Sequence, residues 1–304
     1  MLINAEIFKT KPLIVWLALI ITSCGSGGNK NTTDVKIDSS ELEKDIFADI
    51  SHAKQVFYSL PSPLESAMLI KSAGATYNEK ILNALTNVNK YNTNKSMALN
   101  LGVYITDLSY ASLFDQAQTT IKYMDAAKKM AEGLGITEAI DQNTINRLEE
   151  NINNRDIILD IISETFMSST AFLKENDRQP LATVALVGGW VEGLYIATQL
   201  VGNAPIEGNK IVERIVDQKL SLDMVVKLLE SNKANPDIAS ITKGITDLKK
   251  IYDKITIKSS KIKPVKDEKE NVTTLKSTSS SNVSQEVFTE LKETVKTIRS
   301  NFTL

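Results

Sequence analysis

The chain has 304 residues, of which 42% are apolar and 24% charged, so it can bury a sizeable core and does not have the composition of a disordered protein. Its 35 basic and 37 acidic side chains leave a net charge of −2, which gives no electrostatic reason to expect nucleic acid as a partner. One cysteine and one histidine exclude an intramolecular disulfide, a CxxC redox centre and a Cys/His zinc site, and we expect no metal and no cofactor.

Residues 1–23 have the features of a secretory signal peptide. Two lysines precede an unbroken apolar run at 13–21, which is too short to span a bilayer but typical of the hydrophobic region of a signal. The run ends in the sequence Ile-Thr-Ser-Cys-Gly at 21–25. This sequence resembles the lipobox of bacterial lipoproteins. The resemblance implies that the signal is cleaved before Cys24 and that Cys24 carries the lipid.

The lipobox resemblance also implies how the chain is held at a membrane. A diacylglycerol on Cys24 and a further acyl chain, such as palmitate, on the new amino terminus give a stable anchor, because a single chain holds only marginally. Residues 24–39 are rich in Gly, Asn, Thr and Ser and have little to bury, so we expect a flexible tether. No Asp follows Cys24, which favours the outer membrane of the cell envelope and leaves the leaflet open.

Residues 40–257 are predicted to form an all-α, multi-helix bundle of about ten or more helices. A capping box begins at Ser40, and Ser62, Pro63 and Glu65 supply a second helix start with a cap, a proline and a glutamate in the preferred positions. No stretch alternates convincingly as a strand. Helical periods cover 40–60, 62–74, 78–85, 94–114, 116–132, 137–151, 155–175, 180–201, 209–217, 219–231 and 236–257.

The bundle is followed by a polar linker and a last helix. Residues 258–282 are rich in Lys, Ser and Thr, which is typical of a solvated linker. Residues 283–304 contain a C-terminal amphipathic helix, and its apolar side chains recur at helical spacing, so it is expected to dock on the bundle. These side chains are Val287, Leu291, Val295 and Ile298.

Two segments, 94–114 and 180–201, are apolar around most of the helix and are predicted to be buried at the centre of the bundle. Residues 181–201 are also long enough to cross a membrane. Glu192 near their centre would cost about 3 kcal/mol in lipid, and three glycines weaken the helix, so a central buried helix is favoured over a transmembrane span.

The two central segments show a weak internal echo. A shift of 86 residues pairs Gly102 with Gly188 and Tyr104 with Trp190, and four further pairs follow. The echo is consistent with an old duplication of helical hairpins. It is equally consistent with two buried helices of similar composition, because the offset lies far outside ordinary solenoid periods.

Buried carboxylates are the candidate site residues. Asp107 and Glu192 lie on the two central helices, and a buried carboxylate must find a cation or hydrogen-bond donors, or take up a proton. Such groups cluster at functional sites, although the more common role is structural, as an acceptor for Tyr, Trp or Arg. The candidate ligand-binding residues are Tyr104, Asp107, Tyr110, Trp190, Glu192 and Tyr195.

The stretches SPLESAMLIKSAGA, NLGVYITDLSYASLFDQ and GGWVEGLYIA lie within residues 62–201. They resemble segments of all-helical lipoproteins of uncharacterised function from diderm bacteria. The resemblance implies an all-α envelope protein and supplies no activity and no site residue.

Three functional hypotheses follow from these features. The first is a lipid-anchored module that binds a small ligand or a protein partner in the envelope. The second is an envelope hydrolase that uses Asp107 and Glu192 as an acid/base pair, which requires their carboxyl groups within about 10 Å across one pocket. The third is a structural subunit of a membrane assembly, which requires a sizeable exposed apolar patch. The sequence contains no catalytic set, which favours the first hypothesis.

Overall fold

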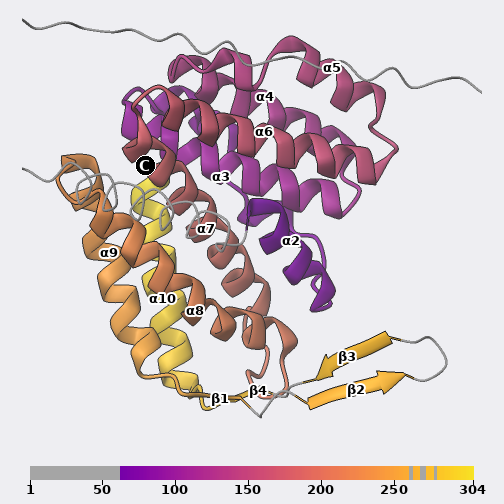
Figure 1. The fold of residues 1–304 in the computed structure, drawn as a ribbon, viewed down its shortest axis with the longest axis vertical. Helices are drawn as coiled ribbons and strands as arrows, with labels where there is room; N and C mark the ends of the chain where they lie inside the picture. The colour runs from indigo at the N-terminus through magenta and orange to yellow at the C-terminus, as the bar shows by residue number, and fades with distance from the viewer. Residues whose placement is uncertain (1–61, 260–262, 268–271, 277–278) are drawn as a thin grey trace, which may run out of the picture. The chain divides into compact units, whose positions relative to one another are not determined.

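A computed structural model describes residues 62–259, 263–267, 272–276 and 279–304 (Figure 1). The signal peptide, Cys24, the tether and the helix predicted at 40–60 lie outside the described residues.

The described residues form nine α-helices, three short 3-10 helices and four short strands. The helices are α2 (Pro63–Ser72), α3 (Asn94–Leu113), α4 (Ala117–Gly133), α5 (Gln142–Glu150), α6 (Arg155–Glu175), α7 (Gln179–Val201), α8 (Lys210–Ser231), α9 (Pro236–Asp253) and α10 (Gln285–Thr303). The 3-10 helices are η1 (Glu79–Ile81), η2 (Leu85–Lys90) and η3 (Thr137–Ala139). The predicted all-α multi-helix bundle is confirmed.

Local sequence explains where most helices begin. Seven of the nine described α-helices have an N-cap side chain that accepts a hydrogen bond from the first turn, which satisfies an amide that the helix itself leaves free. The predicted capping box of α2 is present, because Ser62 accepts from the Glu65 backbone and Glu65 accepts from the Ser62 backbone.

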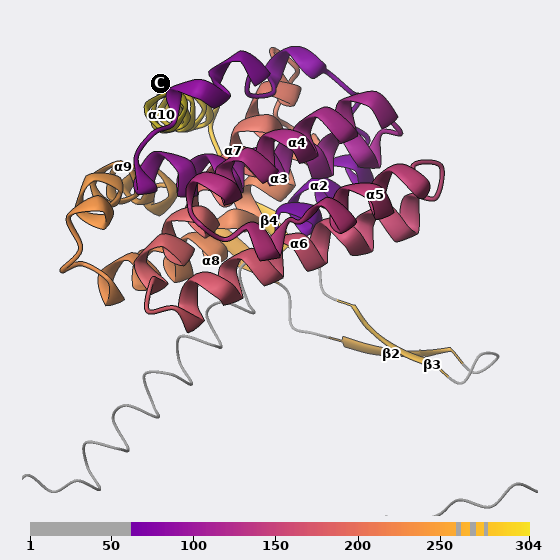
Figure 2. The same cartoon turned by 90° about the horizontal axis from the view of Figure 1, so that it is seen from above.

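Helices α3 and α7 lie inside the other helices in both views (Figures 1 and 2). They contact each other along much of their length, and α4, α6, α2, α8 and α10 pack around them. The hydropathy of α7 would suit a membrane span, but 94% of its most apolar window is buried inside the protein. The prediction of two buried central helices is confirmed, and α7 is the core helix of the bundle.

Glycines allow the two central helices to approach closely. A Cβ atom on Gly102 would collide with the backbone carbonyl of Ala185, and a Cβ atom on Gly188 would collide with that of Leu99. The shift of 86 residues exchanges these two contacts, since 102 + 86 = 188 and 99 + 86 = 185. Each helix therefore needs a glycine where it crosses the other, and this requirement by itself explains glycines at matching positions of the echo.

Helix α8 is continuous, whereas the sequence predicted a break near residue 218. The polar residues there are engaged with neighbouring helices. Gln218 accepts a hydrogen bond from the Trp190 indole, and Lys219 donates to the carbonyl of Ile255 at 2.6 Å. The polar residues that resemble a junction between two helices in the sequence therefore contact α7 and the residues that follow α9.

The segment 258–282, predicted as a linker without strands, contains two antiparallel strand pairs. β1 (Ile257–Ser259) pairs with β4 (Ser279–Ser281), and β2 (Lys263–Asp267) pairs with β3 (Val272–Lys276). Short strands rich in Ser, Thr and Lys lack the apolar alternation by which strands are recognised in a sequence.

The last helix docks on the bundle as predicted. α10 packs against α7, α9 and α3. Its buried residues are Phe288, Leu291, Val295, Ile298, Phe302 and Thr303.

Candidate functional site

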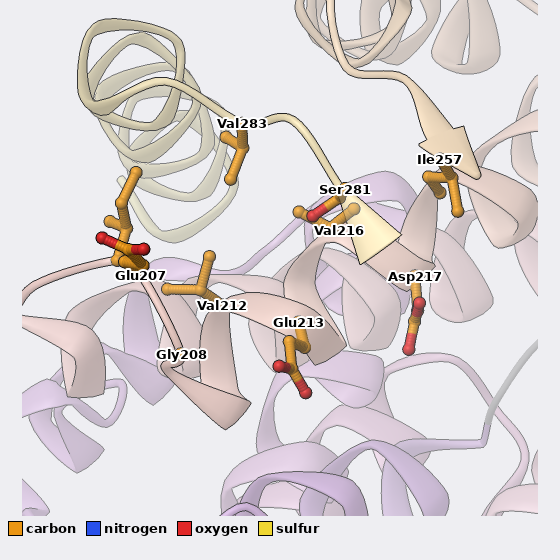
Figure 3. A pocket seen from close by; sticks show the side chains of 10 residues that line it. Glu207, Gly208, Val212, Glu213, Val216, Asp217, Ile257, Ser281 and Val283 are labelled. Carbon is orange, nitrogen blue, oxygen red and sulfur yellow. The ribbon is translucent and has the colours of Figure 1, made fainter. Parts of the chain in front are cut away.

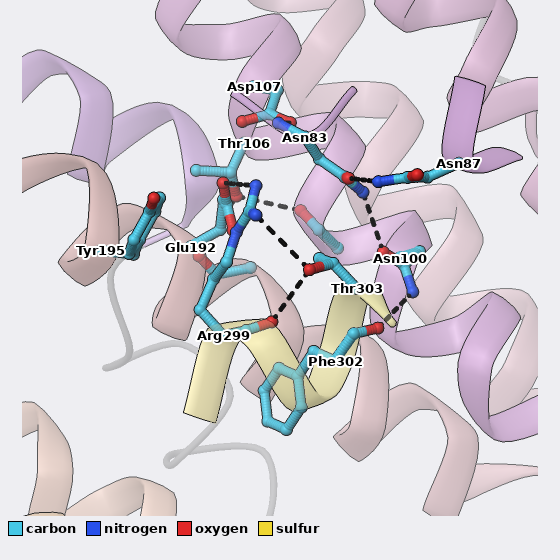
Figure 4. Close-up of polar contacts among 12 residues, drawn as sticks. Asn83, Asn87, Asn100, Thr106, Asp107, Glu192, Tyr195, Arg299, Phe302 and Thr303 are labelled. Atoms are coloured by element: carbon cyan, nitrogen blue, oxygen red, sulfur yellow. Dashed lines mark hydrogen bonds and ion pairs between the residues drawn. The ribbon is translucent and has the colours of Figure 1, made fainter. Parts of the chain in front are cut away.

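Glu192 of α7 and Arg299 of α10 form a buried ion pair (Figure 4). Arg299 Nε lies 2.9 Å from Glu192 Oε2 and Arg299 Nη2 lies 3.1 Å from Glu192 Oε1, so the guanidinium binds the carboxylate through two parallel hydrogen bonds. The Glu192 side chain is fully buried, and 13% of the Arg299 side chain is exposed. The ring of Tyr195 lies over the guanidinium, with 4.7 Å between its centroid and Arg299 Cζ.

The pairing with Glu192 stabilises the charge of Arg299. Burial alone would lower the pKa of the Arg299 guanidinium, because it disfavours the charged form. The neighbouring Glu192 carboxylate outweighs burial and raises the pKa. Arg299 is therefore a permanent cation inside the bundle.

Asp107 of α3 lies next to the ion pair and is fully buried. Burial raises the pKa of Asp107 well above its usual value, and the charge of Glu192 raises it further, against the opposing effects of Arg299 and the Asn83 amide. Asp107 Oδ2 accepts the Asn83 backbone N–H at 3.0 Å, whereas Oδ1 has no partner as a carboxylate oxygen. The raised pKa favours the protonated form of Asp107, and a protonated Asp107 together with the Glu192–Arg299 pair carries no net charge.

Asn83, which precedes η2, is the hub of the surrounding network. Its backbone N–H donates to Asp107, and its carbonyl accepts from the Tyr123 hydroxyl at 2.9 Å. Its side-chain amide donates to the Tyr91 hydroxyl at 3.0 Å and to Asn100 Oδ1 at 3.1 Å, and its side-chain oxygen accepts from a neighbouring asparagine. Every polar group of this fully buried residue is bonded, so the network fixes its position.

The same network binds the end of α10. Asn100 Nδ2 donates to the carbonyl of Phe302 at 2.8 Å, and the Tyr91 hydroxyl donates to the carbonyl of Thr303 at 3.3 Å. These carbonyls belong to the last turn of α10, where the backbone C=O groups have no hydrogen-bond partner within the helix. Side chains of α3 and of the segment before it therefore cap α10 from within the core.

The structure brings four of the six candidate ligand-binding residues into one region. Asp107, Glu192 and Tyr195 surround Arg299 directly. Tyr104 lies beside the rings of Tyr91 and Tyr123, and burial raises the pKa of its hydroxyl.

The other two candidates lie elsewhere. Tyr110 stacks on Tyr77 with ring centroids 5.3 Å apart, and its hydroxyl donates to the carbonyl of Thr76. Trp190 donates its indole N–H to Gln218 of α8 at 3.2 Å. The six residues therefore do not line one common pocket.

Asp107 and Glu192 are not arranged as in glycoside-type hydrolysis, where two carboxyl groups face a substrate. Both side chains are fully buried, and Arg299 binds both oxygens of Glu192. A substrate therefore has no access to the two carboxyl groups in this conformation.

Sequence reasoning missed Arg299, Asn83 and Tyr91. The signal for Arg299 is its position four residues after Val295 and eight after Leu291, on the apolar face of the amphipathic helix. A cation at that position is expected to bind a buried anion. Asn83 and Tyr91 lie near short 3-10 turns, where no periodic pattern marks a buried polar residue.

No protein family, curated protein or solved structure matches the chain. Within the part of the chain that the structure describes, no group of three or more His, Cys, Asp or Glu side chains could hold a metal ion.

Proposed function

We propose that the protein is a lipid-anchored binding module of a bacterial cell envelope, held at the outer membrane through Cys24. The observation that carries the proposal is the lipobox-like sequence at 21–25, which ends an apolar signal of the right length. The tether at 24–39 separates the anchor from the helical body.

A binding role is favoured over catalysis by the state of the buried acids. Asp107 and Glu192 are the acid/base candidates on the central helices. Glu192 is bonded to Arg299, and Asp107 accepts the backbone N–H of Asn83. These bonds join α7 to α10 and α3 to the segment before η2, which is a structural role. A helical body whose interior groups are engaged in this way acts through its surface.

Metabolic labelling tests the anchor. Cells that express the full chain are grown with radiolabelled palmitate, and the wild type is compared with Cys24→Ala. Because Cys24 is the only cysteine in the chain, we expect label in the wild type and none in the variant. Equal labelling of the two chains, or no label in either, would overturn the proposal.

A further inference from the structure

A cleft of about 460 Å³ lies where the loop before α8 and the first turns of α8 meet the ends of β1 and β4 (Figure 3). Its volume lies within the range of about 300–1,000 Å³ that is usual for ligand sites. None of the candidate residues chosen from the sequence lines it. The lining residues are Ile206, Glu207, Gly208, Val212, Glu213, Val216, Asp217, Ile257, Ser281 and Val283.

The cleft combines an apolar floor with an acidic rim. Val212 and Val216 are each 2% exposed and form the base, and Ile257 and Val283 are half-buried at its side. Glu207, Glu213 and Asp217 also line the cleft, and in Figure 3 the carboxylate of Glu213 points away from Val212 and Val216. The lining therefore offers an apolar base to aliphatic groups and negative charge at its edge.

The carboxylates of the rim differ in whether they are already neutralised. Asp217 accepts a hydrogen bond from Arg214 at 3.0 Å. Glu207 and Glu213 are exposed and form no ion pair within the described residues. Lys219 on the same helix is engaged with the carbonyl of Ile255. Two acidic groups of the rim thus have no cationic partner among the described residues.

We infer that this cleft binds a basic, aliphatic peptide segment of a partner protein, with aliphatic side chains on the valine floor and ammonium or guanidinium groups on Glu207 and Glu213. The inference rests on the proposed binding function and names the surface and the chemistry of the partner. Charge complementarity selects a cationic partner, and the apolar floor distinguishes a peptide with aliphatic side chains from a simple polyamine.

The test uses the full chain, purified in detergent, and a rhodamine-labelled peptide with the sequence lysine–valine–valine–lysine. Fluorescence anisotropy measures binding at increasing protein concentration. We expect saturable binding that weakens as salt is added, because exposed charges are screened. Replacing both valines with serine, or both lysines with glutamine, is expected to weaken binding about five- to tenfold in each case.

Matched variants locate the site. Glu207→Gln with Glu213→Gln is expected to weaken binding about five- to tenfold, whereas Glu149→Gln with Glu150→Gln, on the exposed face of α5, leaves it unchanged. All four positions are exposed, so none of these changes disturbs the core.

Several outcomes would overturn the inference. These are no binding up to about 1 mM protein, equal binding of the serine peptide, or binding that ignores the Glu207 and Glu213 changes. A dimer of the full chain in sedimentation that the double change dissolves would assign the cleft to a second copy instead. If the chain takes up palmitate but does not bind the peptide, the proposed lipid anchor is supported and only the inference about the cleft is wrong.

Discussion

The chain uses carboxylates in two opposite ways. Glu192 lies in the core and is bonded to Arg299 through both of its oxygens, whereas Glu207 and Glu213 lie on the rim of a cleft and have no cation among the described residues. Burial explains the difference, because an unpaired charge is costly inside a protein and nearly free at its surface. The comparison teaches that the acids most conspicuous in the sequence are those already bonded within the protein, whereas the unpaired ones lie in a polar loop, as Glu207 does, or in the first turn of a surface helix, as Glu213 does.

The largest expected effect comes from breaking the buried pair. Arg299→Met leaves Glu192 charged and unpaired, which is expected to lower the free energy of unfolding by about 3–5 kcal/mol. Urea unfolding measures this change. Arg147→Met, which removes the exposed pair with Glu164, serves as the control and is expected to cost less than about 1 kcal/mol.

A double change distinguishes an unpaired charge from lost packing. Glu192→Leu combined with Arg299→Met removes both charges, so it is expected to recover most of the stability that the single change loses. A double variant as unstable as Arg299→Met alone would contradict the role assigned to the ion pair.

The second prediction concerns the proton on Asp107. Its pKa is raised in the folded state, so its contribution to stability is full below the usual value near 3.8 and is lost as the pH rises towards the raised value. Within that window the free energy of unfolding is expected to fall by up to about 1.4 kcal/mol per pH unit.

Asp107→Asn isolates this effect. An asparagine keeps the oxygen that accepts from the Asn83 backbone N–H and stays uncharged at every pH. We expect the variant to lose this part of the pH dependence and to be at least as stable as the wild type at neutral pH, as measured by urea unfolding between about pH 5 and pH 8. Parallel pH profiles for the two proteins would show that Asp107 is ionised in the folded state.

A smaller effect is expected at the end of α10. Asn100→Ala removes the donor to the Phe302 carbonyl and the acceptor for the Asn83 amide, which is expected to cost about 2 kcal/mol. Thermal unfolding checks this value, with the exposed Asn146→Ala on α5 as the control. If both variants melt at the same temperature, the carbonyls of the last turn do not need this cap.

The smallest effect is expected at the cleft. Glu207→Gln together with Glu213→Gln is expected to change the free energy of unfolding by less than about 0.5 kcal/mol, because both side chains are exposed and form no ion pair with another described residue. Urea unfolding next to the wild type measures this. A larger loss would mean that these carboxylates have partners within the fold, which would weaken the contrast with Glu192.

Sequence patterns predicted the fold well and the candidate site only in part. Caps such as Ser62 and the apolar run around Glu192 are local features, so the helices and the two central segments could be predicted. The partner of Glu192 could not, because Arg299 lies 107 residues away and follows several other charged residues of the same amphipathic helix. The cleft was missed for a similar reason, since Glu207 and Gly208 resemble a polar turn until β1 and β4 are placed beside them.

Arg299 follows Glu192 by 107 residues, so the two partners of the buried ion pair are also separated in time during synthesis. A ribosome adds about 5–20 residues per second, so the residues of α7 are made roughly 5–20 s before Arg299. During that interval the chain lacks both α10 and the cation that neutralises Glu192, so the core of the bundle is incomplete.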